Sequence, residues 1–404
     1  MLSPALRRWL FRAHLLLGLT FGIFILPLAL TGILLSFEAQ ITQAADRRSL
    51  RAAPHPPQSE QRSLAAILAA HHCVVTNSPV TGITYFASTE DPLRVHYGRD
   101  HVHLVHPISG TCLGPGSPQL RQFFREVLSM HRWLGWSSLL KPDNQGSSHW
   151  KSVGAQITGA SALGLLLLTC SGLVLWFPRR ITRRVWRALC LPTWHKNGRT
   201  RAWNWHHVSG IWSAPILLLI SATGVIMAYP HANRLFYAVF GESAPTRDGN
   251  KMKSREPSSQ PHHSSSQNLW FHQLEGIPKF ATTMMPGWVN LNIEPTQNST
   301  TPETLCLTLT RAGRGRPDLR ERFTLIPSRM EILQHEIFAT LSPASRARQW
   351  VRWLHTGEAG GWFGQFCAAS ACIGTFILVW SGFSLLFRRW NSNRPKEPKS
   401  PNPN

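Results

Sequence analysis

The sequence predicts an α-helical membrane protein, in which four transmembrane helices form a parallel internal duplication with two extracytoplasmic α+β insertions. Three observations predict this fold class. Four long windows carry no charged residue, basic residues cluster beside alternate window ends, and one histidine pattern occurs twice along the 404 residues. Each of these observations concerns the helices, so the insertions are predicted from their own strand-like patterns.

The four uncharged windows each exceed the roughly 20 residues that cross a hydrocarbon core. The first is expected to be an uncleaved anchor, because its apolar run is longer than the core of a signal peptide. The windows are Ala13–Phe37, Ser152–Pro178, Ala202–Asn233 and Ala359–Phe387.

Basic residues set the expected orientation. They precede the first span, fill the segment between the second and third spans, and follow the fourth from Arg388. Both termini are therefore expected in the cytoplasm of a bacterial inner membrane, with the two large loops periplasmic. The net charge of +22 is partly this topology signal. No soluble basic domain is present, so a nucleic-acid partner is not expected, whereas arginines in the outer loops offer positive charge to an anionic lipid or ligand.

The expected order of segments follows from the spans. It runs from a cytoplasmic N-terminus with the first span (1–37) through a first periplasmic domain (38–130), a linker helix with the second span (131–180), a cytoplasmic basic loop (181–205), the third span (206–230), a second periplasmic domain (231–354) and the fourth span (355–389) to a cytoplasmic tail (390–404).

The outer segments show strand and helix patterns of their own. Strands are predicted at Gly82–Ala87, Leu93–Tyr97, His101–His106, Trp288–Glu294, Thr304–Thr310 and Arg322–Ile326, and helices at Ser63–His72, Leu120–Leu134 and Ser345–Leu354. The Ser- and Pro-rich stretch Asp248–Gln267 is predicted to be a flexible insertion. Lys141–Trp150 is an insertion in the first half of the repeat.

The repeated pattern begins with a histidine near the start of a span. His14-x-x-x-Gly18 is followed by Thr31-Gly32, and His206-x-x-x-Gly210 is followed by Thr223-Gly224, with seventeen residues from histidine to threonine in both. A second pair, His131 and His355, stands ahead of the second and fourth spans, which contain Ser171-Gly172 and Ser381-Gly382. Histidines at membrane helices are costly without a partner, so four at matching positions indicate a function.

The topology sorts the four histidines into two pairs, His14 with His206 and His131 with His355. Each pair places one imidazole from each half on the same side of the membrane. Opposed imidazoles are axial ligands for a six-coordinate haem, and such ligation favours electron transfer. The sequence therefore predicts two b-type haems.

Other residues support or compete with this assignment. Gly18 and Gly210 lie one turn after a histidine and would clear a haem face, although glycine also serves tight helix packing. Arg7 and Arg12 are candidate contacts to haem propionates, as are Arg132 and Arg352. The alternative ligands are His207, His149 and His231, so the outer ligands remain open among His131, His149, His231 and His355.

The seven cysteines show no metal-binding spacing. Cys73 and Cys112 share the first outer loop, where an oxidising periplasm would permit a disulfide. The sequence does not decide whether they pair.

The chain resembles the PepSY-associated transmembrane family of bacterial inner-membrane proteins. The elements that carry the resemblance are Arg8-Trp9…His14…Gly18…Thr31-Gly32, Leu173-x-Leu175-Trp176-x-Pro178-Arg179-Arg180, Trp205-His206-x-x-x-Gly210 and Leu354-His355-x-Gly357. They cover all four spans, and the outer loops, which would be PepSY-like domains, match only loosely.

The resemblance extends to the two-haem inner-membrane ferric-siderophore reductases of the FoxB type. It implies a haem-dependent oxidoreductase that reduces ferric siderophore in the periplasm and so releases iron for uptake. Electrons would come from a quinol or a cytoplasmic reductant, since no dinucleotide-binding motif is present. Two alternatives remain: a transporter of iron, haem or siderophore, and a non-enzymatic binding or regulatory module of the envelope. The siderophore and the oligomeric state are not predicted.

Overall fold

The computed structural model describes residues 3–53, 63–69, 80–97, 101–135, 145–178, 182–194, 198–245, 273–296 and 304–392. The chain forms two compact units. The helical unit comprises 1–36, 125–232 and 354–404, and the sheet unit comprises 37–124 and 233–353. Asp248–Gln267, predicted to be a flexible insertion, lies outside the described residues.

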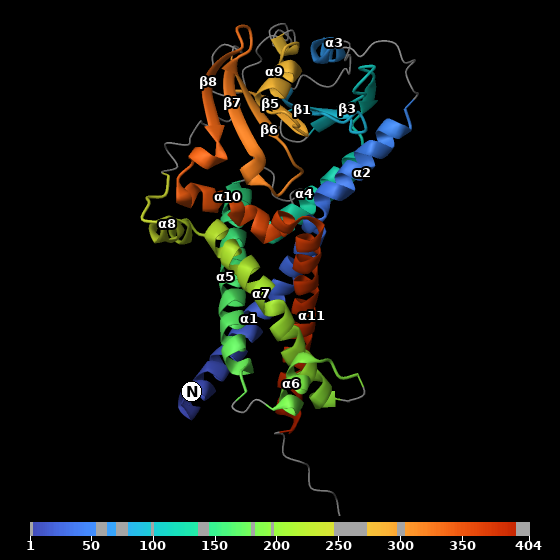
Figure 1. Ribbon diagram of the computed structural model, residues 1–404. Coiled ribbons are helices and arrows are strands. Elements are labelled where there is room, and N and C mark those ends of the chain that lie inside the picture. Colours follow the sequence, from blue (N-terminus) through green and yellow to red (C-terminus); the bar gives the residue numbers. More distant parts are fainter. Residues whose placement is uncertain are drawn as a thin grey trace, which may run out of the picture. The chain divides into compact units, whose positions relative to one another are not determined.

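Four helices of the helical unit are long and apolar enough to cross a membrane, as predicted. They are α1 (Pro4–Ser36), α5 (Gln145–Trp176), α7 (Gly198–Ala228) and α11 (Gly361–Ser392). In Figure 1 they run beside one another as a bundle. Each packs chiefly on two neighbours, in the order α1, α5, α7, α11 and back to α1. Helices α1 and α7 therefore lie diagonally across the bundle. Both continue unbroken through Pro27 and Pro215.

Two shorter helices carry the remaining repeat histidines. These are α4 (Pro118–Trp133) and α10 (Pro343–Thr356), whose last residues belong to the helical unit. Each helix is followed by a residue with a positive φ, Leu134 at 49° and Gly357 at 77°. That left-handed conformation is a common way to end a helix. Helix α6 (Arg183–Cys190) also belongs to this unit, whereas α8 (Pro230–Val239) begins in it and lies mostly in the sheet unit.

Close backbone approaches fix where α4 and α10 meet the spanning helices. A Cβ atom at Gly154 of α5 would overlap the carbonyl of Trp133, and one at Gly364 of α11 would overlap the carbonyl of Gly357. Only glycine fits at such approaches. The two contacts occupy matching places, two residues after His131 and two residues after His355.

The sheet unit contains one antiparallel sheet of eight strands in the order β4-β3-β2-β1-β5-β6-β7-β8 (Figure 1). The strands are β1 (Val80–Phe86), β2 (Leu93–Tyr97), β3 (His101–Val105), β4 (Cys112–Gly114), β5 (Asn290–Pro295), β6 (Leu305–Thr310), β7 (Arg320–Ile326) and β8 (Glu331–Ile337). The centre of the sheet is the β1–β5 pair, in which Ile83 lies opposite Ile293. The sequence predicts two insertions but not that their strands join in one sheet.

One face of this sheet forms the core of the unit. Alternate side chains such as Leu291, Leu307 and Phe323 are fully buried there, as the period of a strand requires. The helices α3 (Leu64–Ala69) and α9 (Ile277–Met284) contribute further core residues. The strands β4 and β8 and the helices α2 (Glu38–Arg51), α8 and α9 were not predicted. Every residue of β8 before Ile337 is exposed, so β8 lacks the buried alternation that reveals a strand.

A buried ion-pair network holds α2 to the sheet unit. The carboxylate of Asp46 is 1% exposed and accepts from Arg94 at 2.9 Å and Arg121 at 2.5 Å. Beside it, Asp91 accepts from Arg47 at 2.8 Å. Breaking such a buried pair from one side leaves an uncompensated charge, so the network is costly to disturb.

Cys112 is disulfide-bonded, while Cys73 lies outside the described residues. The other five cysteines are free.

Candidate functional site

The structure brings together the two histidines of each predicted pair. In the first pair, His14 of α1 and His206 of α7 meet across the diagonal of the bundle, with ring centres 6.4 Å apart and ring planes at 85°. In the second pair, His131 of α4 and His355 of α10 have ring centres 6.3 Å apart and planes at 65°. The two pairs thus share one geometry, although their residues are far apart in sequence.

Each histidine is held through its Nδ1 atom by a hydroxyl group on another helix. The hydroxyl belongs to the serine or threonine of one of the Ser-Gly or Thr-Gly steps noted in the sequence. The Nδ1–Oγ distances are 2.9 Å for His14 with Ser171, 3.0 Å for His206 with Ser381, 2.9 Å for His131 with Thr31 and 3.1 Å for His355 with Thr223.

These contacts fix the tautomer of the imidazoles. Nδ1 of His206 lies 3.2 Å from the carbonyl oxygen of Leu378, and Nδ1 of His355 lies 2.9 Å from that of Ile220. A carbonyl oxygen only accepts, so Nδ1 carries the proton and Nε2 keeps its lone pair. Metal-ligating histidines in proteins are commonly fixed in this way, with the second ring nitrogen donating to a carbonyl or other acceptor.

The serine and threonine hydroxyls are themselves oriented by their own helices. Each donates to the carbonyl four residues earlier, which leaves its oxygen lone pair to accept from the histidine. The distances are 2.7 Å from Ser171 to Leu167, 2.5 Å from Ser381 to Ile377, 2.7 Å from Thr31 to Pro27 and 2.6 Å from Thr223 to Leu219. In the sequence these residues stand out only as part of a repeat. Their recurrence beside glycine in all four spans was the signal of their role.

The glycine of each step lies against the same imidazole. A Cβ atom would lie 3.3 Å from Cε1 of His14 at Gly172 and 3.3 Å from Cε1 of His355 at Gly224. At Gly32 and Gly382 the corresponding distance, to His131 and His206, is 3.7 Å. We call each Ser-Gly or Thr-Gly pair a histidine seat: the hydroxyl holds Nδ1, and the glycine leaves room for the ring.

The spacing of seventeen residues now has a structural meaning. His14 and Thr31 lie on one helix but serve different histidine pairs, and His206 and Thr223 do the same. Seventeen residues of α-helix rise about 25 Å, close to the thickness of a hydrocarbon core. Each of these helices therefore supplies a histidine to one pair and a seat to the other pair, near the opposite side of the membrane.

The ring separation matches two axial ligands of one metal centre. A metal–nitrogen bond of about 2 Å on each side, with about 1.1 Å from nitrogen to ring centre, places two imidazole centres roughly 6.2 Å apart. Ordinary aromatic pairs span about 4.5–7 Å, so the distance alone does not discriminate. The two pairs differ from the His206–His207 contact at 6.2 Å in that every Nδ1 of the pairs lies on the hydroxyl of a seat. Among the described residues, no group of three or more His, Cys, Asp or Glu side chains is placed to hold a bare metal ion.

Burial keeps the second pair in the uncharged form that can bind a metal. Desolvation, followed by the charge of His355, lowers the pKa of His131 to about 4. Desolvation also lowers the pKa of His355. Both imidazoles are therefore neutral near pH 7.

The predicted haem-clearing glycines face the helices that carry the seats. A Cβ atom at Gly18 would lie 3.8 Å from Leu168, and one at Gly210 would lie 3.7 Å from Leu378. Both are ordinary contacts, so helix packing alone does not require glycine there. Haem clearance stays a prediction.

The arginines that were predicted to contact haem propionates make other contacts or are exposed. Arg7 donates to the carbonyl of Leu175 at 2.8 Å, and Arg12 is exposed. Arg132 lies over the ring of Trp133 at 5.1 Å, and Arg352 over that of Trp353 at 5.1 Å.

The three alternative histidines differ in how the structure places them. The ring centre of His207 lies 6.2 Å from that of His206, while its Nδ1 contacts the carbonyl of Trp203 at 2.8 Å and its ring lies 4.1 Å from the Trp203 ring. His207 therefore stays an alternative to its neighbour His206. His231 is exposed on α8. The side chain of His149 lies outside the described part of the chain, so its competing assignment stays open.

Comparison with known proteins places these helices in a family. No curated protein matches the sequence. The family model of the PepSY-associated TM region matches residues 11–389, which include all four histidines and all four seats. The match covers nearly the whole chain, and the chain therefore belongs to the PepSY-associated transmembrane family.

Proposed function

We propose that this protein is a two-haem electron carrier of the bacterial inner membrane that reduces ferric siderophore on the periplasmic side. The observation that carries the proposal is the geometry of the two histidine pairs, with ring centres 6.4 and 6.3 Å apart and Nδ1 occupied. The resemblance to two-haem ferric-siderophore reductases supports the substrate class. In this proposal both termini are cytoplasmic, as the basic flanks favour.

The residues of the chain fit two b-type haems. His14 and His206 would hold one haem, and His131 and His355 the other. When bound between two imidazoles, haem supplies one-electron transfer without an open coordination position. The hydroxyl of each seat orients the imidazole ring. It accepts a hydrogen bond from Nδ1–H, and this raises the basicity of Nε2.

The two haems, one at each histidine pair, would carry electrons from one side of the membrane to the other. Reduction to the ferrous state would release iron, because the softer ferrous ion binds hard-oxygen ligands less tightly. The donor would be a quinol or a cytoplasmic reductant.

Matching contacts support an internal duplication, which we include in the proposal. Exchange of α1 with α7, α4 with α10 and α5 with α11 maps every histidine, seat and glycine approach onto its counterpart. The sheet repeats this relation, with four strands on each side of the junction between β1 and β5. Both halves have the same direction through the membrane.

The transporter alternative finds less support. Transporters of the inverted-repeat type use broken helices at the midplane. Here α1 and α7 run through Pro27 and Pro215 without interruption.

Visible spectroscopy of the detergent-purified chain tests the cofactor. We expect sharp low-spin b-type bands after dithionite reduction, at two haems per chain. H14A and H355A should each remove one haem and leave the other. H207A is the matched control, because His207 is adjacent to His206 but turned to Trp203, and it should keep both. A colourless protein would refute the haem proposal.

Rapid mixing tests the reductase activity. The dithionite-reduced protein, freed of excess reductant, is mixed with ferric siderophores, and the loss of the reduced bands is followed. Oxidation of the bands with release of ferrous iron to a chelator supports the activity. Two bound haems that no ferric siderophore oxidises would leave an electron carrier and refute the reductase.

A further inference from the structure

The last residue of α5 is a tryptophan whose polar atom is buried without a partner. The Nε1 atom of Trp176 has no contact with solvent, and none of the described residues accepts its hydrogen. An indole N–H only donates, and a buried donor without an acceptor is costly. Buried polar groups of native proteins nearly always have a partner, so this atom is expected to meet one that the described residues do not supply. The two histidine pairs and their seats do not use this residue.

The indole of Trp176 lies on the face of α5 that carries the seat of His14. Trp176 follows Gly172 by four residues, so the two residues share one face of the helix. Side chains of a helix lean toward its N-terminus, and the indole therefore covers the turn of Gly172. A Cβ atom at Gly172 would lie 3.3 Å from Cε1 of His14. The unpartnered N–H thus lies next to the first histidine pair.

A guanidinium group lies at the same end of α5. Arg7 of the neighbouring helix α1 donates to the carbonyl oxygen of Leu175 at 2.8 Å, one residue before Trp176 (Figure 1). This contact uses one of the five N–H donors of a guanidinium, so Arg7 is held in place with donors left for a second acceptor. Arg7 precedes His14 by seven residues, which is about 10 Å of helix. Two groups that only donate, one of them charged, therefore lie together at this end of the first histidine pair.

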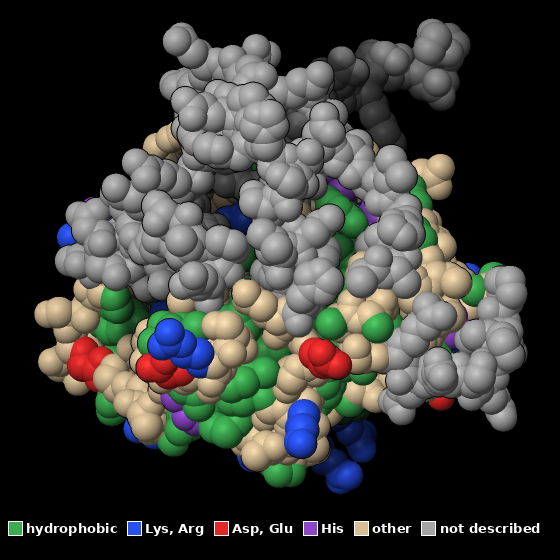
Figure 2. All heavy atoms as spheres, turned by 90° about the horizontal axis from the view of Figure 1, so that it is seen from above, with side chains coloured by type: hydrophobic (Ala, Val, Ile, Leu, Met, Phe, Trp, Pro, Cys, Tyr) green, Lys and Arg blue, Asp and Glu red, His purple; other side chains and the backbone are tan. Residues whose placement is uncertain are grey.

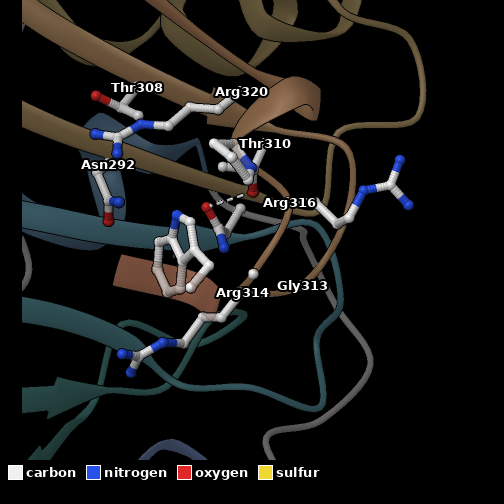
Figure 3. Close-up of a pocket in the computed structure, with 11 residues that line it drawn as sticks. Asn292, Thr308, Thr310, Gly313, Arg314, Arg316 and Arg320 are labelled. Atoms are coloured by element: carbon white, nitrogen blue, oxygen red, sulfur yellow. Dashed lines mark hydrogen bonds between the residues drawn. The ribbon is translucent and has the colours of Figure 1, made fainter. Parts of the chain in front are cut away.

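The helices around the first pair supply no carboxylate to these two donors. Arg316, drawn at a cleft of the sheet unit in Figure 3, is paired with Asp318 at 2.7 Å, and on the face drawn in Figure 2 one group of basic side chains lies beside acidic ones. By contrast, α1, α5, α7 and α11 contain no Asp or Glu. In the described part of the helical unit the acidic residues are Glu126 and Glu358, each within five residues of a histidine of the second pair. A bound group would therefore have to bring the carboxylate.

We propose that the indole N–H of Trp176 and the guanidinium of Arg7 together bind a propionate carboxylate of the haem that His14 and His206 hold. The inference rests on the haem part of the proposed function. A carboxylate has two oxygens with lone pairs, so it accepts from both donors at once. Its negative charge makes both hydrogen bonds stronger than bonds between neutral groups.

The internal repeat does not account for this tryptophan. Trp176 stands five residues after Ser171, and the equivalent residue after Ser381 is Leu386, which has no polar side-chain atom. The indole donor therefore belongs to one half of the chain only. It gives the first haem site a direction that two matching histidines and seats do not give it.

Haem with esterified propionates tests the contact. The full chain in detergent is reconstituted with haem or with its dimethyl ester, and transfer to excess apomyoglobin is followed by visible spectroscopy. The background is H355A, which in the haem proposal keeps the haem of the first pair alone. W176F should speed the loss of haem about tenfold or more, because it removes a hydrogen bond to a charged group. It should change the loss of the ester by no more than about twofold, since the ester carries no charge for the indole to meet.

W186F is the matched control. Trp186 packs against Trp176 with ring centres 5.9 Å apart, but it is 52% exposed, so W186F alters the same aromatic cluster without removing the buried donor. Loss of haem from W186F should stay within about twofold of the unsubstituted chain. R7Q should speed the loss of haem as W176F does. In H14A, whose remaining haem would be that of the second pair, W176F should have no effect.

Equal loss of haem from W176F and W186F, or equal effects of W176F on haem and on its ester, would overturn the inference. If W176F binds no haem in either background, the ester comparison in H355A alone decides. The ester should then be lost about tenfold faster than haem, and equal loss would overturn the contact. Two bound haems without these differences refute the contact alone. A colourless chain refutes the haem proposal and the contact with it, whereas a failure to reduce siderophore concerns only the reductase.

Discussion

Alanine in place of the seat glycines gives a matched test of how the histidines are held. A Cβ atom at Gly172 would lie 3.3 Å from Cε1 of His14, whereas one at Gly382 would lie 3.7 Å from Cε1 of His206. The first distance is tighter than ordinary van der Waals contact, and the second is ordinary. We expect G172A to displace the His14 ring by a few tenths of an ångström and G382A to leave His206 in place.

The magnitude follows from the difference between the two variants. Both replace a glycine inside a helix and so gain about 0.5–1 kcal/mol of helix stability, which cancels in the comparison. Changes to the groups that orient a metal ligand typically cost about 10–100-fold in affinity. We therefore expect G172A to lower the affinity for haem about tenfold and G382A to retain it.

The assay is the haem content of detergent-purified variants, with electron paramagnetic resonance of the low-spin ferric state as a measure of ligand geometry. The second pair repeats the comparison, with G224A as the crowded variant at 3.3 Å from His355 and G32A as its control at 3.7 Å from His131. Equal loss in the crowded and control variants, or no change in any of the four, would refute the seat as described.

Four further predictions concern single side chains. G18A should fold normally, because the added Cβ makes an ordinary contact; a specific loss of haem would show that Gly18 clears the haem face, and unchanged haem content would exclude that role. T31V should lower haem content, because the hydroxyl contact with Nδ1 at 2.9 Å contributes about 0.5–1.5 kcal/mol, a change of up to roughly tenfold in affinity. D46N should destabilise the sheet unit by about 3–5 kcal/mol in denaturant unfolding while leaving the haem spectrum unchanged, since it leaves two arginines without their buried carboxylate. Burial acts to raise the pKa of Asp91, but hydrogen bonds from Arg47 and Gln43 and the charges of Arg47 and Arg94 together outweigh it, and the pKa is lowered. The resulting stability is present above the unfolded value of about 3.9 and is lost as pH falls through the folded pKa, so the melting temperature should fall more steeply below about pH 4 than in D91N.

The sequence predicts the membrane helices well because their signal is local. The length and composition of a span decide whether it crosses a membrane, and all four predicted spans are helices. The strands β1, β2, β3, β5, β6 and β7 are found within a few residues of their predicted bounds, because alternation is also a local signal. The exposed strand β8 carries no such signal and was missed.

The sequence does not predict which strands pair with one another or which segments of the chain pack into one unit. The two insertions join in one sheet through β1 and β5, which are separated by about half of the chain. The sequence pattern of neither strand indicates that it pairs with the other, since strand pairing depends on the packing of both faces. The division of the chain into a helical unit and a sheet unit arises from the same long-range contacts.

The sequence by itself predicted two histidine pairs, because the repeat and the charge flanks assign every span a direction, but it left the outer pair open among His131, His149, His231 and His355. Only the tertiary structure decided which hydroxyl holds which histidine. Thr31 follows His14 on the same helix, yet it holds His131, and Ser171 holds His14. The physical reason is the helix itself. Seventeen residues of helix separate the histidine from the threonine of the same motif by about 25 Å along the axis. A seat therefore holds a histidine of another helix that lies at the same depth as the seat, and it does not hold the histidine of its own helix.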